Sequence, residues 1–152
     1  MPVRRIILLV SVAALAVAAV GHASASKSVT ISAKKVSGLG TVLVDAKGHT
    51  LYMFVPDKQK RVTCVKDCAV AWPPVKVAKG QKIVGTNGVQ AKLLGSDPNP
   101  AGGSVVTYNH WPLYTYVADT KPGQATGQAL DANGGLWYVL STSGKVIKTK
   151  MH

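Results

Sequence analysis

The sequence predicts an all-β fold, a compact sandwich or open barrel of short strands built from two similar repeats. Short apolar runs lie at close spacing between turns rich in glycine, asparagine and proline, a pattern typical of sandwiches and barrels. The pattern Leu-Tyr-x-aromatic-Val-x-Asp occurs at residues 51–57 and again at 113–119, which indicates an internal repeat. Helical periodicity is nearly absent, and only the stretch around Cys64 to Trp72 favours a short helical turn.

Residues 1–25 have the pattern of a secretory signal peptide. Arg4 and Arg5 precede an almost unbroken apolar run at 6–20, and Ala23-Ser24-Ala25 supplies the small residues of a cleavage site. The apolar run is shorter than the roughly 20 residues that a membrane-spanning helix needs. We therefore expect export, cleavage after Ala25, no remaining transmembrane anchor, and a location in the cell envelope or outside the cell.

The remaining residues, 26–152, are predicted to form a single secreted β domain, with repeats at about 41–78 and 104–141. The full chain has 18 Lys and Arg residues against 6 acidic ones, all aspartates, and a net charge of +12. Without Arg4 and Arg5, 16 basic and 6 acidic residues remain, so the net charge is +10. This charge predicts weak attraction to anionic polymers of the cell envelope.

Specific recognition of nucleic acid is not expected. The lysines are scattered along the chain, and Arg61 is the one arginine that follows the leader. Arginine is the usual residue for bidentate contacts to phosphates and bases. The composition therefore favours a solvated cationic surface.

The mature chain begins with two predicted strands. Residues 29–36 alternate apolar and polar side chains, as a half-buried strand does. A turn at Gly38-Leu39-Gly40 leads into a second apolar run at 41–46. Two short strands joined by a glycine turn predict a hairpin.

The first motif is predicted to be a strand buried on both faces, ended by Pro56-Asp57. Successive side chains of a strand point to opposite faces. The alternation therefore places Leu51, Met53 and Val55 on one face of the strand and Tyr52 and Phe54 on the opposite face.

Further strands are predicted along the rest of the chain. Residues 75–84 and 89–94 are predicted to be short strands, with a tight turn at Asn87-Gly88 between them. Residues 95–103 contain two prolines and are predicted to be a loop. Later strands are expected at 104–108, in the second motif, at 136–140 and at 145–149, with a glycine-rich stretch at 122–135.

The repeated residues of the two motifs are the first candidates for a site. They are Tyr52, Phe54, Asp57, Tyr114, Tyr116 and Asp119. Aromatic residues in strands usually belong to the core, although a binding platform or a redox-active row is an alternative. The aspartates are interpreted as turn caps. A catalytic pair is the alternative, and it requires Asp57 and Asp119 to share a cleft.

Cys64 and Cys68 are the only cysteines, and in an exported chain they are predicted to form a disulfide. So small a loop constrains the unfolded chain by only about 2 kcal/mol. A redox role is the alternative, although the spacing is not Cys-x-x-Cys. A metal site built from these cysteines with His49 and His110 is a second alternative. No cofactor is expected, since the Cys-x-x-Cys-His of c-type haem is absent.

No catalytic constellation is recognised in the sequence. It lacks a Gly-x-Ser-x-Gly elbow, and its glycine-rich stretch lacks the Gly-Lys-Ser/Thr of a phosphate-binding loop. We therefore expect a non-enzymatic secreted protein with a structural or ligand-binding role. The alternative is a redox or metal-binding protein that uses Cys64 and Cys68.

Several motifs together resemble one bacterial family. They are Cys-x-x-x-Cys-Ala-x-x-Trp-Pro-Pro at 64–74, Pro-Leu-Tyr-x-Tyr-x-x-Asp at 112–119, Pro-Gly-x-x-x-Gly-Gln at 122–128 and Gly-x-Trp-Tyr-Val at 135–139. From about Val42 to Val146 the chain resembles the secreted-repeat family of predicted lipoproteins, described by a repeated Tyr-x-aromatic-x-x-Asp motif. The resemblance implies an exported protein of unknown function. The anchoring cysteine of the lipoprotein members is missing, so membrane attachment is not implied.

Overall fold

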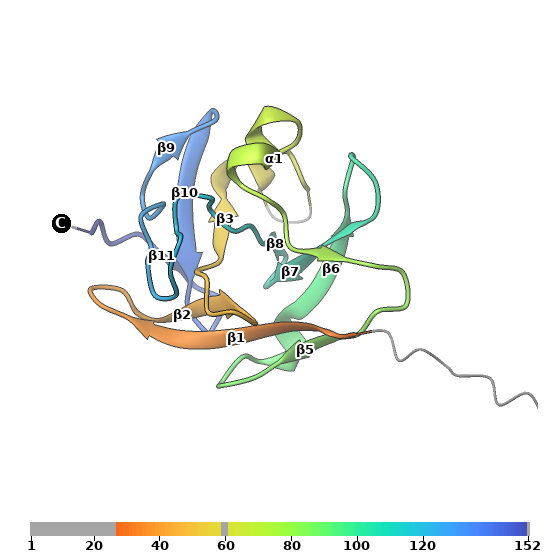
Figure 1. Ribbon diagram of the computed structural model, residues 1–152, viewed down its shortest axis with the longest axis horizontal. Coiled ribbons are helices and arrows are strands. Elements are labelled where there is room, and N and C mark those ends of the chain that lie inside the picture. Colours follow the sequence, from red (N-terminus) through yellow and green to blue (C-terminus); the bar gives the residue numbers. More distant parts are fainter. Residues whose placement is uncertain (1–26, 59–60, 152) are drawn as a thin grey trace, which may run out of the picture.

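The computed structural model describes residues 27–58 and 61–151, so the predicted leader at 1–25 lies outside the described residues. Within the described ranges the chain forms eleven strands, one short α-helix and two 3-10 helices (Figure 1). The strands are β1 (Val29–Val36), β2 (Gly40–Asp45), β3 (Tyr52–Phe54), β4 (Lys76–Val77), β5 (Ile83–Gly85), β6 (Leu94–Pro98), β7 (Ser104–Tyr108), β8 (Trp111–Pro112), β9 (Asp131–Ala132), β10 (Gly135–Leu140) and β11 (Val146–Ile147). The helices are η1 (Val55–Asp57), α1 (Asp67–Ala71) and η2 (Ala91–Leu93).

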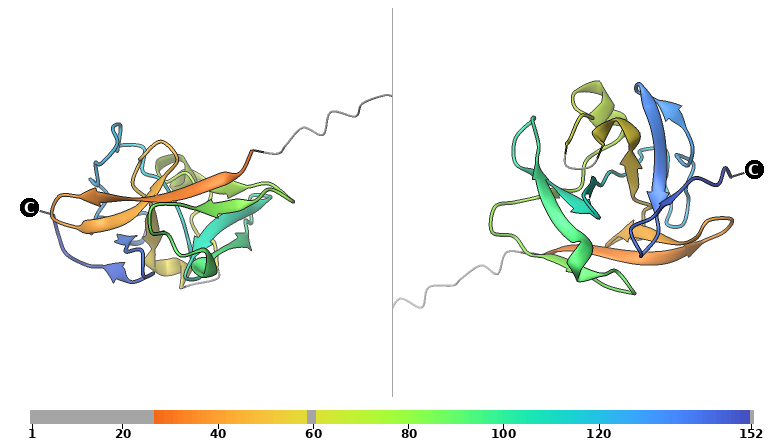
Figure 2. Two further views of the ribbon diagram at one scale, coloured as in Figure 1. Left: turned by 90° about the horizontal axis from the view of Figure 1, so that it is seen from below. Right: turned by 180° about the vertical axis from the view of Figure 1, so that it is seen from behind.

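The strands form three small open sheets, which confirms the predicted all-β class. Their orders are β2-β1-β5, β11-β10-β3 with β9 beside β10, and β4-β7-β6 with β8 beside β7. The first sheet forms the base and the other two stand on either side of it (Figures 1 and 2). Contacts of β2 with β10, β5 with β6 and β3 with β8 join each sheet to the other two. The predicted hairpin is present as the antiparallel pair β1 and β2.

The first motif lies between two hydrophobic clusters, as its alternation predicts. Tyr52 and Phe54 belong to the cluster that contains the two buried tryptophans. Leu51 and Met53 point into a second cluster, between the base sheet and β7. The prediction is wrong for Val55, which is 40% exposed and begins η1. The strand ends there because the following proline has no N–H to donate to a ladder.

The region between the two repeats differs from its predicted structure. The predicted strand at 75–84 is split into β4 and β5, which lie in different sheets, because the chain turns at Gly80 with a φ of 78°. Residues 89–94 contain η2 instead of a strand. Part of the predicted loop at 95–103 is the strand β6, which pairs with β7. Pro98 is tolerated there because β6 is an edge strand.

The second motif is not a regular strand. Within it, Tyr114 makes isolated bridges to Tyr52 and Pro74, and the backbone N–H of Val117 donates to the carbonyl of Ala71. The motif therefore packs between β3 and the segment that follows α1. The last predicted strand, 145–149, is shorter than expected, since β11 covers only Val146–Ile147.

One glycine allows the aromatic core to pack closely. A Cβ atom added to Gly127 would lie 2.6 Å from the Trp72 ring and 3.1 Å from the Tyr52 ring. Both rings are fully buried, so neither can move away into solvent. We expect Gly127→Ala to lower the free energy of unfolding by about 1–3 kcal/mol through overpacking, as measured by urea denaturation.

A double-mutant cycle with Trp72→Phe checks the physical cause. The smaller ring removes the atoms that the new methyl group would strike, so Gly127→Ala should cost less in the Trp72→Phe background. Equal costs in both backgrounds would show that the clash is not the source of the destabilisation.

Candidate functional site

The two repeats meet at a pair of equivalent tyrosines. The backbone N–H of Tyr52 donates to the Tyr114 carbonyl at 2.8 Å, and the N–H of Tyr114 donates to the Tyr52 carbonyl at 2.9 Å. Both side chains are completely buried. The same motif position of each repeat therefore contacts its counterpart.

The tyrosine hydroxyls cross over to the aspartates of the opposite repeat. Tyr114 donates to Asp57 Oδ2 at 2.7 Å, and Tyr52 donates to Asp119 Oδ2 at 2.5 Å. The two carboxylates are 0% and 5% exposed. A buried polar group needs a hydrogen-bond partner. The aspartate of each repeat supplies the acceptor for the tyrosine hydroxyl of the other repeat.

A threonine in each repeat occupies the second carboxylate oxygen. Thr63 donates to Asp57 Oδ1 from its backbone N–H at 2.8 Å and from its hydroxyl at 2.6 Å. Thr126 makes the matching bonds to Asp119 Oδ1 at 2.9 and 2.6 Å. These bonds, from the backbone and the hydroxyl of each threonine, hold the loop after each motif.

Burial shifts the ionisation of this network. Desolvation raises the pKa of Asp57, the hydrogen bonds from Thr63 and Tyr114 oppose the rise, and the nearby Asp97 carboxylate adds to it. Burial also raises the pKa of Tyr52 and of Tyr114 well above the usual range, and the aspartate partner of each adds to the rise. Both tyrosines therefore stay protonated and act as hydrogen-bond donors.

Four aromatic rings stack in a column beside the crossed pairs. Tyr116 stacks on Trp72 at a centroid distance of 4.0 Å, Trp72 on Trp137 at 3.9 Å, and Trp137 on Phe54 at 4.1 Å. Each repeat therefore contributes one tryptophan to the centre and one motif aromatic to an end. The two motif tyrosines, Tyr52 and Tyr114, meet Trp72 and Trp137 edge-on, a favourable arrangement for aromatic rings.

The tryptophans and threonines are residues that sequence reasoning missed. Trp72 donates from its ring N–H to Asn133, and Trp137 donates to the Ala132 carbonyl, each at 3.1 Å. A signal was present, because one tryptophan follows each motif and one threonine follows each motif aspartate by six or seven residues. These pairs are recognisable only when the whole repeat, and not the motif alone, is aligned with itself.

Asp57 and Asp119 lie in the core, where hydrogen bonds from the protein occupy both oxygens of each carboxylate. The network leaves neither oxygen of either group facing solvent as a general base requires. The arrangement therefore joins the repeats and does not present a reactive pair.

The predicted disulfide is present between Cys64 and Cys68, whose Cα atoms are 5.2 Å apart. Cys64 is buried and Cys68 packs against the aromatic cluster, so the bond fastens α1 to the core. His49 Nδ1 lies 3.2 Å from Asp45 Oδ2, and His110 is exposed in a turn. In the described ranges no three His, Cys, Asp or Glu side chains gather as metal ligands, so the candidate set of histidines and cysteines is not brought together.

Removing either crossing hydroxyl tests the network. We expect Tyr52→Phe and Tyr114→Phe each to lower the free energy of unfolding by about 1.5–3 kcal/mol, because each leaves a buried carboxylate oxygen without its donor. Urea denaturation measures the loss. Tyr138→Phe is the matched control, since the Tyr138 side chain is only partly buried and lies outside the crossed pairs. A loss for Tyr138→Phe equal to the other two would contradict the prediction.

The raised pKa of Asp57 predicts a pH dependence of stability. The native carboxyl keeps its proton to a higher pH than the unfolded one, whose ordinary value is 3.8. The native state therefore binds more protons in the window above 3.8, and stability falls as the pH rises through it. The side chain introduced by Asp57→Asn cannot titrate, so the stability of this variant should lack the pH-dependent contribution of Asp57. Urea unfolding of both proteins between about pH 3 and pH 7 gives the difference, and a difference that is constant or opposite in sign would disprove the assignment.

Comparison with known proteins agrees with the repeat seen in the structure. The model of a family described as a secreted repeat of unknown function matches residues 35–76 and 98–141. Each matched segment holds one motif, one threonine partner and one column tryptophan. No curated protein and no solved structure matches the chain. None of the helices in the described part of the chain is long and apolar enough to cross a membrane. The chain belongs to the family of secreted repeats of unknown function, as its motifs predict.

Proposed function

We propose that this protein is a non-enzymatic binding domain, held at anionic polymers of the cell envelope by its cationic surface. The observation that carries the proposal is the placement of charge. Every Lys and Arg in the described ranges is exposed, and within those ranges none forms an ion pair with a carboxylate. They are Lys27, Lys34, Lys35, Lys47, Lys58, Arg61, Lys66, Lys76, Lys79, Lys82, Lys92, Lys121, Lys145, Lys148 and Lys150.

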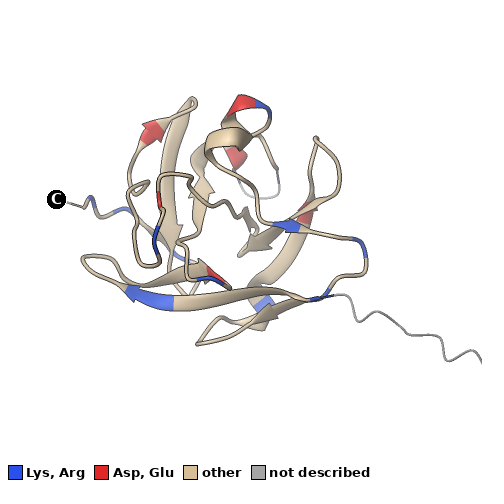
Figure 3. Ribbon diagram, in the orientation of Figure 1, with Lys and Arg blue, Asp and Glu red and all other residues tan. Residues whose placement is uncertain are grey.

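Part of the negative charge is placed differently. Asp57 and Asp119 are buried in the crossed hydrogen bonds and Asp45 lies beside His49, whereas Asp67 and Asp131 are exposed. The solvent-facing surface therefore carries a larger excess of positive over negative side chains than the composition of the chain indicates. Figure 3 shows the basic residues distributed over the base sheet, β4, the loops and the C-terminal segment.

The chemistry of these cations supports weak, delocalised binding. Lysine ammonium groups are strongly hydrated point charges without the fork geometry that arginine offers to phosphates. Spread over a rigid domain, they attract a long polyanion through many screened contacts. Such attraction suits retention on a polymer and does not require a catalytic cleft.

Salt dependence tests the proposal. The exported protein should be retained on an immobilised phosphodiester polymer at about 0.05 M salt and released at about 1 M, where the Debye length falls to about 3 Å. An uncharged matrix of the same support is the control. Retention that does not change with salt, or no retention at low salt, would refute the proposal.

Charge variants show whether the attraction is delocalised. The double variants K79Q/K82Q and K148Q/K150Q remove two exposed cations each, one pair from the segment between β4 and β5 and the other from the C-terminal segment. Both should lower the salt concentration of elution by similar amounts. If one pair abolished retention and the other had no effect, a discrete site would replace the proposed surface.

A further inference from the structure

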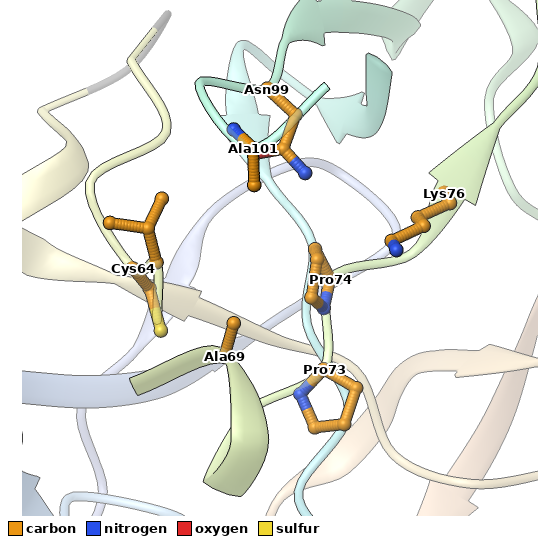
Figure 4. A pocket seen from close by; sticks show the side chains of 8 residues that line it. Cys64, Ala69, Pro73, Pro74, Lys76, Asn99 and Ala101 are labelled. Atoms are coloured by element: carbon orange, nitrogen blue, oxygen red, sulfur yellow. The ribbon is translucent and has the colours of Figure 1, made fainter. Parts of the chain in front are cut away.

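A pocket beside the disulfide has the features of a small-molecule site. It has a volume of about 170 Å³ and lies between the start of α1, the segment before β4 and the turn after β6 (Figure 4). Its lining residues are Cys64, Val65, Ala69, Pro73, Pro74, Lys76, Asn99 and Ala101. Most of this lining is apolar, as in the sites where proteins bind small ligands.

Asn99 is the polar residue built into the pocket wall. Its side chain is only 7% exposed. Its Oδ1 accepts the N–H of Ala101 at 3.0 Å, and its backbone bonds to Gly102 and Gly103 close the turn. Because Oδ1 is occupied, the orientation of the amide is determined. The Nδ2 group makes no hydrogen bond among the described residues, and it is not one of their buried unpaired atoms, so it remains accessible to donate.

Lys76 supplies a positive charge at the same pocket. It lies on β4 and is exposed, so its ammonium group is at the rim. Figure 4 shows the side-chain nitrogens of Asn99 and Lys76 on the side of the pocket that Pro74 forms, away from Cys64. The two polar side chains thus offer an N–H donor and an ammonium group above an apolar floor.

The Asn99 amide and the Lys76 ammonium group together favour a negatively charged ligand. A carboxylate accepts hydrogen bonds through both oxygens and is attracted to an ammonium group, and such charge-assisted bonds are stronger than neutral ones. A ligand that carries a cation at this position would be repelled by Lys76. The proline rings and the Val65 and Ala69 side chains would cover an apolar body.

The volume limits the size of that body. The pocket is close to the roughly 150 Å³ of an apolar cavity that admits benzene. A carboxylate at the rim with a short branched alkyl group on the prolines therefore matches both the donors and the volume. We propose that this pocket binds a small carboxylate with a short apolar body, either a free short-chain acid or the C-terminal residue of a peptide.

The site shares Lys76 with the proposed cationic surface, but it adds a shaped cavity and one fixed amide. Salt screens the long-range attraction of a polymer to exposed lysines more than it weakens a direct contact in the pocket, so binding here should persist in salt. The test is an NMR titration of the isotope-labelled exported protein in about 0.5 M salt. The probes are 4-methylpentanoate for the free acid, N-acetyl-leucine for the peptide end, and 4-methylpentanamide as the neutral match.

The expected result is saturable shifts of the Asn99 side-chain amide and of the pocket residues, with a Kd on the order of 1 mM for so small a ligand. The acid should bind about tenfold or more tightly than its amide, because the amide lacks the charge. Preference for N-acetyl-leucine over the free acid would identify a peptide end as the source, and the reverse preference a free acid.

Matched variants separate the site from its surroundings. Asn99→Asp keeps the oxygen that accepts Ala101 N–H but replaces the donor with a repelling carboxylate, so it should weaken binding about tenfold or more. Lys76→Gln should also weaken it. Asn87→Asp and Lys79→Gln change charge equally at exposed positions outside the pocket and should leave the Kd unchanged. An otherwise unchanged spectrum shows that each variant folds.

Three results would overturn the inference. Equal binding of the acid and the amide would mean nonspecific apolar contact. Equal effects of the pocket variants and their controls would mean adsorption to surface lysines. The absence of shifts up to about 50 mM ligand, far above the expected Kd, would mean that the pocket holds only water. Retention of Asn99→Asp on the phosphodiester polymer is measured in parallel, so failure here is distinguishable from failure of the proposed function.

Discussion

The crossed hydrogen bonds between Tyr52 and Asp119 and between Tyr114 and Asp57 are the constraint on which the domain depends. Each bond takes its donor from one repeat and its acceptor from the other. A single repeat would bury a tyrosine hydroxyl without its acceptor and one carboxylate oxygen without its tyrosine donor, which costs more than the bond itself contributes. The two repeats therefore share one hydrophobic core.

The aromatic column follows from the same pairing. Once the two motif tyrosines lie side by side, the tryptophans of the two repeats meet face to face and the outer rings cover them. Gly127 keeps the space beside Trp72 and Tyr52 free of a side chain. The packing leaves the centre of the molecule rigid and chemically closed, because every carboxylate oxygen in the network already has a donor.

Two features of the surface are proposed to bind other molecules, and they differ in physical character. In the proposed function the exposed lysines together attract a polyanion over long distances. Salt screens this attraction because the lysines are hydrated and, in the described part of the chain, form no ion pairs with carboxylates. The pocket acts over a few ångströms through the fixed Asn99 amide and an apolar floor of prolines. We propose that the first feature retains the domain on an anionic polymer while the second recognises a small carboxylate.

What the sequence by itself determined is local: the β class, the repeated motif, the two-faced alternation of Leu51 to Phe54, and the disulfide between cysteines four residues apart. Each depends on the side-chain period of a strand or on short spacing, which a chain carries without its fold. Only the tertiary structure decided that Tyr52 bonds to Asp119, that Trp72 stacks on Trp137, and that residues 75–84 divide between two sheets. These are contacts between residues far apart in the chain, and local periodicity holds no information about which distant partner will satisfy a buried donor or cover a ring.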